Sequence, residues 1–496
     1  MKLIRYGIAF ILGVLFLGCV EDTTNKDIAA VNRITFSGMD KEYVRNMGDS
    51  LKIWPEWTNS VAGTSAEEYD FLWFFSTNKS TYAADTLSRE KELEIEIKTL
   101  PGEYTLTYKV THKLTGVFDV CQSKVRVDGD YSRGMLILAE NDGYAQLNFL
   151  PATGNLVSGV YEGANGEKLG KNPRRVMFVN PSSKLPALKE VYVLCADEQG
   201  GVFLNPNNLQ KRAAVREGFF IPLEDEIVEG NLYFKPKSGS MADYLLLGGK
   251  AYNRSFNMGE IRYKSALVAD AKGYELAPWH FSNPSAAWFY DGLNRRFLAH
   301  KTANKGELIT FRAVDNQFDP NQVGLDLVCG GYGAAGRPNR IYGLFKNPGT
   351  GEYSVLNINV DPAEYTMSLR SQYPINDQKH LISASCYELP EYTYFNYLIF
   401  YGWESQIYVY NADTDVSELL YDFSVESDRD VVVDCLEVAS KTELRVGVRD
   451  RKLIGKQGGY VVLKMTELGG LSIDRTVAPV EKYGFCDKVV DFETKQ

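Results

Sequence analysis

The sequence is poor in cysteine and histidine. Its 496 residues include 7 Cys and 4 His. So few cysteines in a chain of this length cannot build the dense disulfide framework of small secreted domains. The histidines, at positions 112, 280, 300 and 380, lie far apart, so no local zinc motif or two-histidine–carboxylate motif is present. We therefore expect no metal and no cofactor.

An excess of positive charge is also missing. The chain carries 54 basic and 64 acidic side chains, which gives a formal net charge of −10. A nucleic-acid-binding surface needs a basic footprint to neutralise phosphates, so we expect no nucleic acid as a partner. The composition is otherwise that of a globular protein, with 44% hydrophobic and 24% charged residues. The 12% of aromatic residues and the 43 Gly favour β structure with many turns.

Local catalytic motifs are absent as well. No G-x-S-x-G nucleophile elbow occurs, and no Cys has a credible His partner. Residues 331–336 match G-x-G-x-x-G, but residues 337–339 and a strand follow in place of a helix, so we interpret them as a loop between two repeats. Carboxylate pairs that meet only in three dimensions, such as Glu140, Asp142 or Asp291, stay open. We assign no catalytic residue and leave enzymatic activity undecided, with a binding protein favoured.

The N-terminus carries a secretion pattern. Lys2 and Arg5 precede an apolar run of 11 residues, 7–17, which is shorter than the roughly 20 residues that a membrane-spanning helix needs. The run ends in Phe16-Leu17-Gly18-Cys19, which resembles the lipobox cleaved by the bacterial lipoprotein signal peptidase. This resemblance implies a signal peptide over residues 1–18 and an acylated Cys19. The alternative is an ordinary signal peptide in which Cys19 has no role.

The residues after Cys19 indicate a destination. Glu21-Asp22 resembles the export signal that sends Bacteroidota lipoproteins to the outer face of the outer membrane. The resemblance implies that the acyl chains of Cys19 hold the protein in outer-membrane lipid, facing the cell exterior. Residues 19–30 would then be a tether, and no later segment approaches 18 continuous apolar residues.

Residues 31–130 predict a small β-sandwich. Leu93, Ile95 and Ile97 alternate with glutamates, which is the pattern of a strand with one buried face. A Pro101-Gly102 turn and a second alternating strand follow, and Trp73 lies at the centre of an earlier aromatic strand. About seven short strands in roughly 100 residues suggest an immunoglobulin-like sandwich. With Cys121 as its only cysteine, this region cannot hold an inter-sheet disulfide.

The order of these features resembles polycystic-kidney-disease (PKD) domains. The shared features are a Trp strand, an acidic alternating strand, Pro-Gly-Glu-Tyr at residues 101–104 and a Val-Thr hairpin. The region looks closest to the PKD-like lipoproteins of Bacteroidota. The resemblance places Trp73 and Tyr104 in the core and implies an accessory protein encoded beside a starch-utilisation-type importer.

Residues 134–496 contain a repeated β unit. Each unit begins with an apolar strand, followed by a turn and an alternating strand, and the mean spacing is about 52 residues, the size of a four-stranded propeller blade. The seven strand starts are Met135, Val191, Tyr244, Ala287, Ile341, Leu398 and Leu444. We predict an all-β chain whose second part is a β-propeller of about seven blades, with residues 485–490 in a strand that closes the ring. A stacked pair of sandwich domains is the alternative.

Aromatic residues supply the candidate binding site. Trp279, Trp288, Tyr290, Tyr401 and Trp403 sit in or at the ends of predicted blade strands. Sugar rings and peptide side chains both stack on exposed aromatic faces. These five residues are therefore candidates for ligand binding, and the alternative is that they fill the cores of the blades.

The function that these features favour is binding without catalysis. We expect a surface lipoprotein that captures glycan or peptide for an outer-membrane nutrient uptake system. The expected partners are a TonB-dependent importer and its binding lipoprotein. One alternative is a propeller-type glycosidase or lyase with dispersed carboxylates. The other is a structural partner that docks on the importer.

Overall fold

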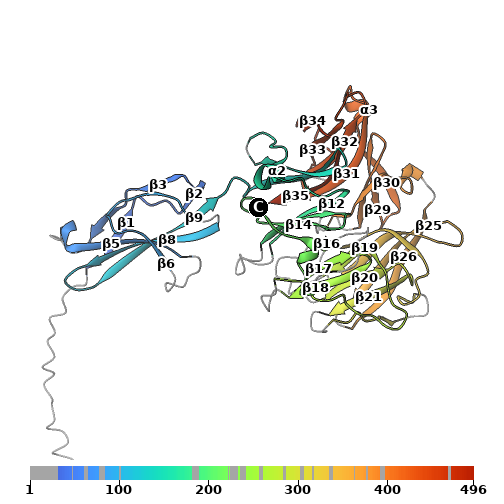
Figure 1. Ribbon diagram of the computed structural model, residues 1–496, viewed down its shortest axis with the longest axis horizontal. Coiled ribbons are helices and arrows are strands. Elements are labelled where there is room, and N and C mark those ends of the chain that lie inside the picture. The colour runs from blue at the N-terminus through green and yellow to red at the C-terminus, as the bar shows by residue number, and fades with distance from the viewer. Residues whose placement is uncertain are drawn as a thin grey trace, which may run out of the picture. The chain divides into compact units, whose positions relative to one another are not determined.

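The computed structural model describes residues 32–495 with internal gaps (Figure 1). The gaps are 47, 61–64, 77–83, 100–101, 153, 181–188, 222, 224–232, 235–241, 256–260, 283–285, 302–305, 315–317, 334–338, 362–363, 376–377, 391–396 and 467–470. The predicted signal peptide, Cys19 and the tether lie outside the described residues. No helix within the described part of the chain is long and apolar enough to span a bilayer.

The chain divides into two compact units. Unit 1 is Met1–Asp128 and unit 2 is Gly129–Gln496. Unit 1 contains the strands β1 (Ile34–Ser37), β2 (Glu42–Asn46), β3 (Ser50–Ile53), β4 (Glu56–Asn59), β5 (Tyr69–Ser76), β6 (Ala84–Ser88), β7 (Leu93–Glu96), β8 (Gly102–His112) and β9 (Phe118–Asp128). Their sheets have the orders β2-β9-β8-β5-β6, β1-β4 and β3-β7.

Trp73 forms the centre of the core of unit 1. Its side chain is fully buried, and its ring stacks on that of Tyr108 with 4.1 Å between centroids. The indole Nε1 donates a hydrogen bond to the carbonyl of Glu90 at 3.0 Å, so the polar atom of the ring is satisfied. The predicted core position of Trp73 is confirmed, whereas Tyr104 is only half-buried and stacks on Phe75.

Unit 2 is built from seven sheets in the described residues. The first three contain β10 (Gly134–Asn141), β11 (Tyr144–Pro151) and β35 (Lys488–Lys495); β12 (Pro173–Val179), β13 (Glu190–Cys195), β14 (Gly201–Leu204) and β15 (Lys211–Ala214); and β16 (Tyr233–Phe234), β17 (Ala242–Leu247) and β18 (Lys250–Ser255). The fourth and fifth contain β19 (Leu276–Ser282), β20 (Ala286–Asp291) and β21 (Arg296–Lys301); and β22 (Arg312–Ala313), β23 (Asp326–Gly333), β24 (Asn339–Lys346), β25 (Tyr353–Asp361) and β26 (Thr366–Ile375). The last two contain β27 (Cys386–Glu388), β28 (Leu398–Trp403), β29 (Gln406–Asn411) and β30 (Val416–Asp422); and β31 (Val431–Ser440), β32 (Glu443–Asp450), β33 (Gly458–Lys464) and β34 (Val480–Cys486).

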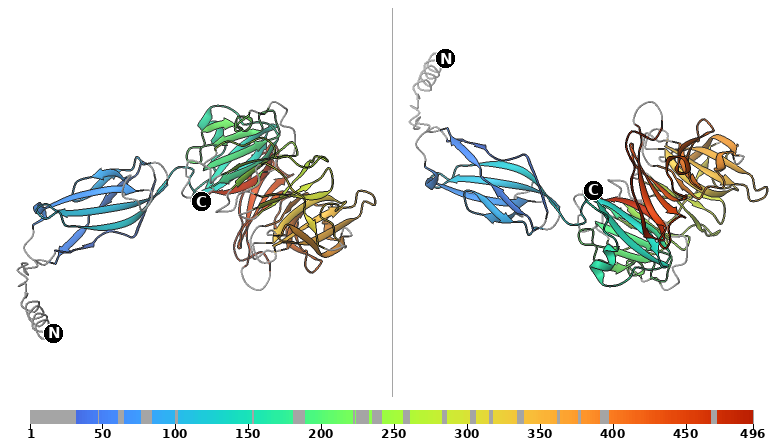
Figure 2. Two further views of the ribbon diagram at one scale, coloured as in Figure 1. Left: turned by 90° about the horizontal axis from the view of Figure 1, so that it is seen from below. Right: turned by 90° about the horizontal axis from the view of Figure 1, so that it is seen from above.

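The last strand of the chain pairs with the first strand of unit 2. β35 runs antiparallel to β10, from Gly134 opposite Lys495 to Glu140 opposite Lys488, so the two ends of unit 2 share one sheet (Figure 2). Each of the other six sheets uses strands from one continuous stretch of sequence. Short helices, α2 (Val160–Asn165) and α3 (Phe423–Glu426), lie among the strands.

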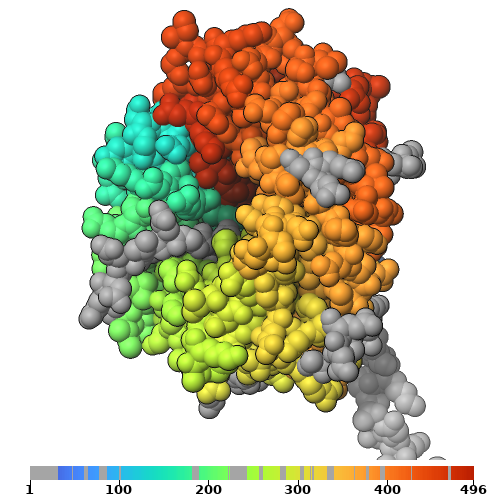
Figure 3. Space-filling view, turned by 90° about the vertical axis from the view of Figure 1, so that its right-hand side faces the viewer, coloured from blue at the N-terminus to red at the C-terminus, as the bar shows by residue number. Residues whose placement is uncertain are grey.

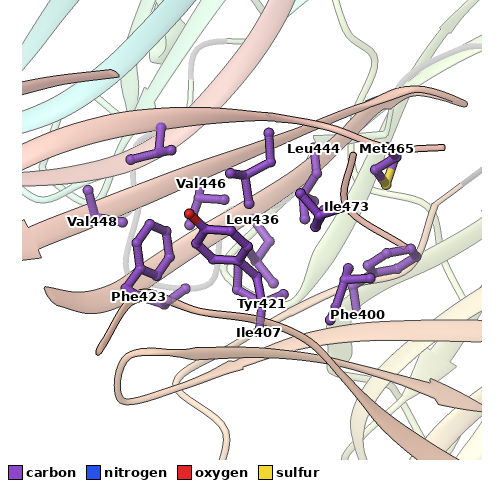
Figure 4. Close-up of a cluster of buried hydrophobic side chains, with 14 of the residues drawn as sticks. Phe400, Ile407, Tyr421, Phe423, Leu436, Leu444, Val446, Val448, Met465 and Ile473 are labelled. Carbon is purple, nitrogen blue, oxygen red and sulfur yellow. The ribbon is translucent and has the colours of Figure 1, made fainter. Parts of the chain in front are cut away.

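Buried apolar clusters join each sheet of unit 2 to the next. In Figure 3 the segments of unit 2 follow one another around the visible face in chain order, and this face is hollowed at its centre. The cluster between the sixth and seventh sheets is drawn in Figure 4, where Phe400, Ile407 and Tyr421 meet Leu436, Leu444 and Val446. A further cluster joins the seventh sheet back to the first through residues that include Tyr460, Cys486, Met135, Ile137 and Val489.

Where neighbouring sheets cover both faces of a strand, that strand is buried along its length, whereas strands such as β34 and β30 are largely exposed. All six residues of β20 are buried. The glycine-rich segment 331–336 is also placed differently from our interpretation. Residues 331–333 end β23, which pairs with the next strand, β24, so the segment joins two strands of one sheet and not two repeats. Residues 334–338 lie outside the described part.

Candidate functional site

Four charged side chains from four sheets meet in unit 2. They are Arg175 of β12, Glu388 of β27, Glu437 of β31 and Asp491 of β35, which we call the charged cluster. The three carboxyl groups lie near the Arg175 guanidinium, because the negative charges of Asp491, Glu388 and Glu437 each raise its pKa. The four positions come from the second, sixth, seventh and first sheets.

Backbone and side-chain donors fix these carboxylates. The Arg175 guanidinium Nε lies 3.5 Å from Asp491 Oδ2, which also accepts a hydrogen bond of 2.9 Å from the Val176 N–H. Glu388 Oε1 accepts a hydrogen bond of 3.3 Å from the N–H of Val438, in the next sheet. On β32, the Arg445 guanidinium donates to Glu437 at 2.8 Å. These contacts hold the carboxylates in fixed positions, and the Arg175 side chain is 44% exposed.

The two central carboxyls differ in protonation. Burial raises the pKa of Glu388 to about 8, with Arg175 opposing and Glu437 reinforcing the shift. Burial also raises the pKa of Asp491 to about 6, against the effect of Arg175. Glu388 therefore keeps its proton to a higher pH than Asp491, which favours Glu388 as the hydrogen-bond donor and Asp491 as the acceptor of the cluster.

Three of the aromatic candidates are core residues. Trp288 and Tyr290 lie on β20 and pack between the fourth and fifth sheets, and Tyr401 packs between the fifth and sixth. Their exposed fractions are 3%, 0% and 0%, so no ring face is open to a ligand. The hydroxyl groups of Tyr290 and Tyr401 donate to the backbone carbonyls of Leu325 and Lys379. These residues correct the sequence-based assignment, since the strands that carry them are covered on both faces.

Trp403 and Trp279 remain partly accessible. The ring of Trp403, at the end of β28, stacks on the imidazole of His380 with 3.5 Å between centroids and an interplanar angle of 4°. Lys379 and His380 both adopt the left-handed backbone conformation, with φ of 61° and 62°, which positions the imidazole over the indole. Trp279 packs at the edge of the core between the fifth and sixth sheets. The five predicted aromatics therefore do not form one site.

Burial raises the pKa of every cysteine thiol that the structure describes. They are Cys121, Cys195, Cys329, Cys386, Cys435 and Cys486. A thiol with a raised pKa is protonated at neutral pH and is a poor nucleophile. Within the described ranges, no group of three or more His, Cys, Asp or Glu side chains is arranged to hold a metal ion.

Sequence reasoning missed every member of the charged cluster. Arg175, Glu388, Glu437 and Asp491 belong to no local motif, and Val176 lies 315 residues from the carboxylate that it contacts. One signal was available for Asp491, a single acid within the apolar run Val489-Val490-Asp491-Phe492. A charged side chain loses solvation free energy when it is buried at such a position. An acid that is found there is therefore a candidate for a functional residue.

Solved structures that are similar to the chain have low identity with it. A quinonprotein alcohol dehydrogenase-like protein from Bacteroides thetaiotaomicron is 12% identical, with a TM-score of 0.34, over 92% of this chain and 95% of that one. Apo AztD from Citrobacter koseri is 10% identical, with a TM-score of 0.35, over 86% and 98%. An auxiliary nutrient binding protein from Bacteroides thetaiotaomicron is 10% identical, with a TM-score of 0.30, over 78% and 84%.

No curated protein matches the chain. One family model does. The PKD-like family matches residues 19–173, a stretch that runs through unit 1 and into the first sheet of unit 2. The resemblance to PKD-like proteins that the Trp strand and the Pro-Gly-Glu-Tyr turn suggested is therefore found in the family comparison as well.

Proposed function

We propose that this protein is a lipid-anchored surface protein that binds a polar polymer, glycan or peptide, without cleaving it. The observation that carries the proposal is the charged cluster, in which Arg175, Glu388, Glu437 and Asp491 converge from four sheets. A ligand rich in hydroxyl or amide groups needs both donors and acceptors, and the cluster supplies a guanidinium, a carboxylic acid and carboxylates.

The proposed scaffold is a seven-bladed β-propeller, with each sheet of unit 2 as one blade. Two observations support it. β35 pairs with β10, so the ends of the unit meet in one blade. Apolar clusters also join each sheet to the next and the seventh to the first, as a closed ring requires. The innermost strands of such a ring would surround its axis, where the cluster residues of β12, β27, β31 and β35 would gather.

The cellular setting in this proposal comes from the sequence. An acylated Cys19 would hold the protein in the outer membrane with unit 2 available to the exterior, and Glu21-Asp22 supports export. A TonB-dependent importer and its binding lipoprotein would receive the captured polymer. A purely structural role, in which unit 2 docks on the importer, predicts co-purification with the transporter and no retained ligand.

The test of binding is retention of polymers on the purified protein. Candidate glycans and peptides are incubated with the full chain, and retention is measured together with new reducing ends and new peptide termini. We expect retention without products, and Arg175→Gln should weaken it by about tenfold, the usual effect of losing one charge-assisted hydrogen bond. The matched control is Arg312→Gln, because that side chain is 73% exposed and lies outside the cluster. Products that persist through purification would contradict the proposal.

The protonation of the cluster favours a second candidate function. A neutral Glu388 beside an ionised Asp491 is the arrangement that an acid–base hydrolase or lyase uses at pH 7. In that case Glu388→Gln would abolish product formation and leave polymer retention unchanged, because the amide keeps the shape of the side chain but cannot give up a proton.

A further inference from the structure

The hairpin between β8 and β9 of unit 1 exposes apolar side chains. Leu114 is 90% exposed, and Val117 and Phe118, where the turn meets β9, are 39% and 53% exposed. Val120 lies two residues further along β9, on the same face as Phe118, and is exposed as well. Single exposed apolar residues are common, whereas four within seven residues favour an interaction surface. We call these four residues the hairpin tip.

Hydrogen bonds within the turn fix the shape of the hairpin tip. The Gly116 N–H donates to the His112 carbonyl, and the His112 N–H donates to the Val117 carbonyl, both at 2.8 Å. The Thr115 N–H donates to His112 Nδ1 at 3.3 Å, and the Val117 N–H donates to Thr115 Oγ1 at 3.4 Å. Backbone groups that are satisfied inside the turn can leave water at little cost, which is a requirement for any segment that enters lipid.

The chain enters unit 1 at the same end as the hairpin tip. The Ile34 N–H donates to Asp119 Oδ2 at 2.8 Å, and Asn32 Nδ2 donates to the Tyr69 hydroxyl at 2.6 Å. Tyr69 is the first residue of β5 and lies opposite the last residue of β8. Strand β9 begins at this end and has 11 residues, so the chain leaves unit 1 roughly 34 Å away, at the other end.

The length of chain before Asn32 favours a lipid surface as the partner of the hairpin tip. Residues 19–31 separate the body of unit 1 from Cys19, the predicted site of acylation. Thirteen residues span at most about 45 Å when fully extended. A lipid anchor at Cys19 would therefore keep this end of unit 1 close to the bilayer, where even a weak contact is made at high effective concentration.

The charged groups at this end offset one another. Three acids lie near a basic side chain, with 3.6, 3.9 and 3.8 Å between charged atoms: Glu68 with His112, Asp70 with Lys113 and Asp119 with Arg33. The Lys109 amine lies over the Phe118 ring, 4.1 Å from its centroid. This end therefore carries no strong excess of one sign. Contact with lipid would depend on burial of the apolar side chains and not on anionic headgroups.

We propose that the hairpin tip inserts into the interface of the bilayer that holds the acylated Cys19. Leu114 and Phe118 enter the boundary between headgroups and acyl chains, and the Lys109 amine stays at the level of the headgroups. The contact orients unit 1 on the bilayer, with the exit of the chain at the end away from the lipid. This inference rests on the proposed function, because the lipid anchor brings unit 1 to the membrane.

The test places a fluorophore on the acylated full chain in phosphatidylcholine vesicles that contain nitroxide-labelled lipid. Thr115→Cys, which is exposed in the turn, carries a polarity-sensitive label. Ser50→Cys carries the same label as the control, because β3 begins beside the end of unit 1 at which the chain leaves. Cys121→Ser is present in both proteins, and burial makes the thiols of unit 2 unreactive. We expect a blue shift and quenching at position 115 and neither at position 50, with the same result when anionic lipid is added.

Leu114→Ser tests the apolar contact directly. A side chain that is 90% exposed packs against little of the protein, so this variant folds like the wild type. The loss of one buried leucine should lower the ratio of inserted to free tip by about tenfold, and quenching at position 115 should fall accordingly. The matched control is Trp54→Ser, which removes an exposed aromatic side chain between β3 and β4 and should leave the quenching unchanged.

Flotation of the vesicles separates failure of this inference from failure of the proposed function. A protein that floats with the vesicles but shows equal quenching at positions 115 and 50 overturns the inference and leaves the anchor in place. So does quenching that Leu114→Ser does not reduce, or quenching that requires anionic lipid. A protein that carries no acyl mass and does not float overturns the proposed anchor, and the inference fails with it.

Discussion

The protonation of Glu388 makes the free energy of unfolding depend on pH. The carboxyl is protonated in the folded protein up to a pKa of about 8, whereas its ordinary value is 4.5. Between these values the unfolded chain releases a proton that the folded chain retains, so rising pH favours unfolding. The stabilisation is complete below about pH 4.5 and is lost as pH rises through 8, by up to about 1.4 kcal/mol for each pH unit.

We therefore predict that raising the pH from 6 to 8 lowers the free energy of unfolding of the wild type relative to that of Glu388→Gln, whereas Lys495, whose pKa burial lowers to about 7, acts equally on both proteins. The amide cannot ionise, so the variant loses this contribution to the slope. Asp491, with a pKa of about 6, makes the free energy of unfolding decline with rising pH in a lower range. For this reason the comparison begins at pH 6. Urea unfolding followed by circular dichroism measures both slopes. Parallel slopes in the two proteins would show that Glu388 ionises normally.

At the scale of elements, β35 joins the end of unit 2 to its beginning. It pairs with β10 at the start of the unit, and it contributes Val489 and Phe492 to the apolar cluster between the seventh and first sheets. Without it, the backbone groups of β10 that face β35 would lack partners and form an exposed strand edge.

We predict that a chain ending at Asp487 is soluble only in small amounts and unfolds without a sharp transition. The reason is the loss of the pairing between β35 and β10 together with the exposed edge of β10, which invites pairing between molecules. Removal of Gln496 alone is the control, since that residue follows β35. Size-exclusion chromatography and thermal unfolding make the comparison. A monomeric truncated chain that unfolds as sharply as the control would mean that β35 is dispensable.

The sequence revealed the repeat because each unit contains a local pattern. All seven predicted strand starts fall on strands, and each lies in a different sheet: Met135 on β10, Val191 on β13, Tyr244 on β17, Ala287 on β20, Ile341 on β24, Leu398 on β28 and Leu444 on β32. An apolar run followed by a turn and a partner strand depends only on neighbours in sequence, so it can be recognised without a structure.

The candidate sites were not predictable by the same means. Trp288 and Tyr401 were ambiguous because strands covered on both faces lack the alternation that separates core from surface. Arg175 and Asp491 meet only because the second sheet packs beside the first. Convergence of this kind is a property of packing, and no spacing along the chain encodes it.

At the scale of the whole molecule, a short connection joins the two units. Strand β9 ends at Asp128 and β10 begins at Gly134, so residues 129–133 join the units. Each unit has its own buried apolar core. We predict that limited proteolysis cuts first at or near this connection and leaves two resistant bodies, identified by mass spectrometry. Prompt loss of both units after the first cut would mean that neither folds without the other.

Attachment to a membrane is the remaining property of the whole molecule. Gly18-Cys19 follows a charged start and an apolar run of 11 residues, and an acylated Cys19 would carry more than one chain. Each buried methylene contributes about 0.8 kcal/mol, so two or more chains give stable anchoring where one gives only reversible binding. We predict that Cys19→Ser moves the protein from the membrane fraction to the soluble fraction and removes the acyl mass. Cys121→Ser, in unit 1, is the matched control and should leave the protein in the membrane fraction with its acyl mass intact. A Cys19→Ser protein that stays with the membrane, together with a wild-type protein that lacks acyl mass, would instead place the attachment in protein–protein contacts, as the docking alternative requires.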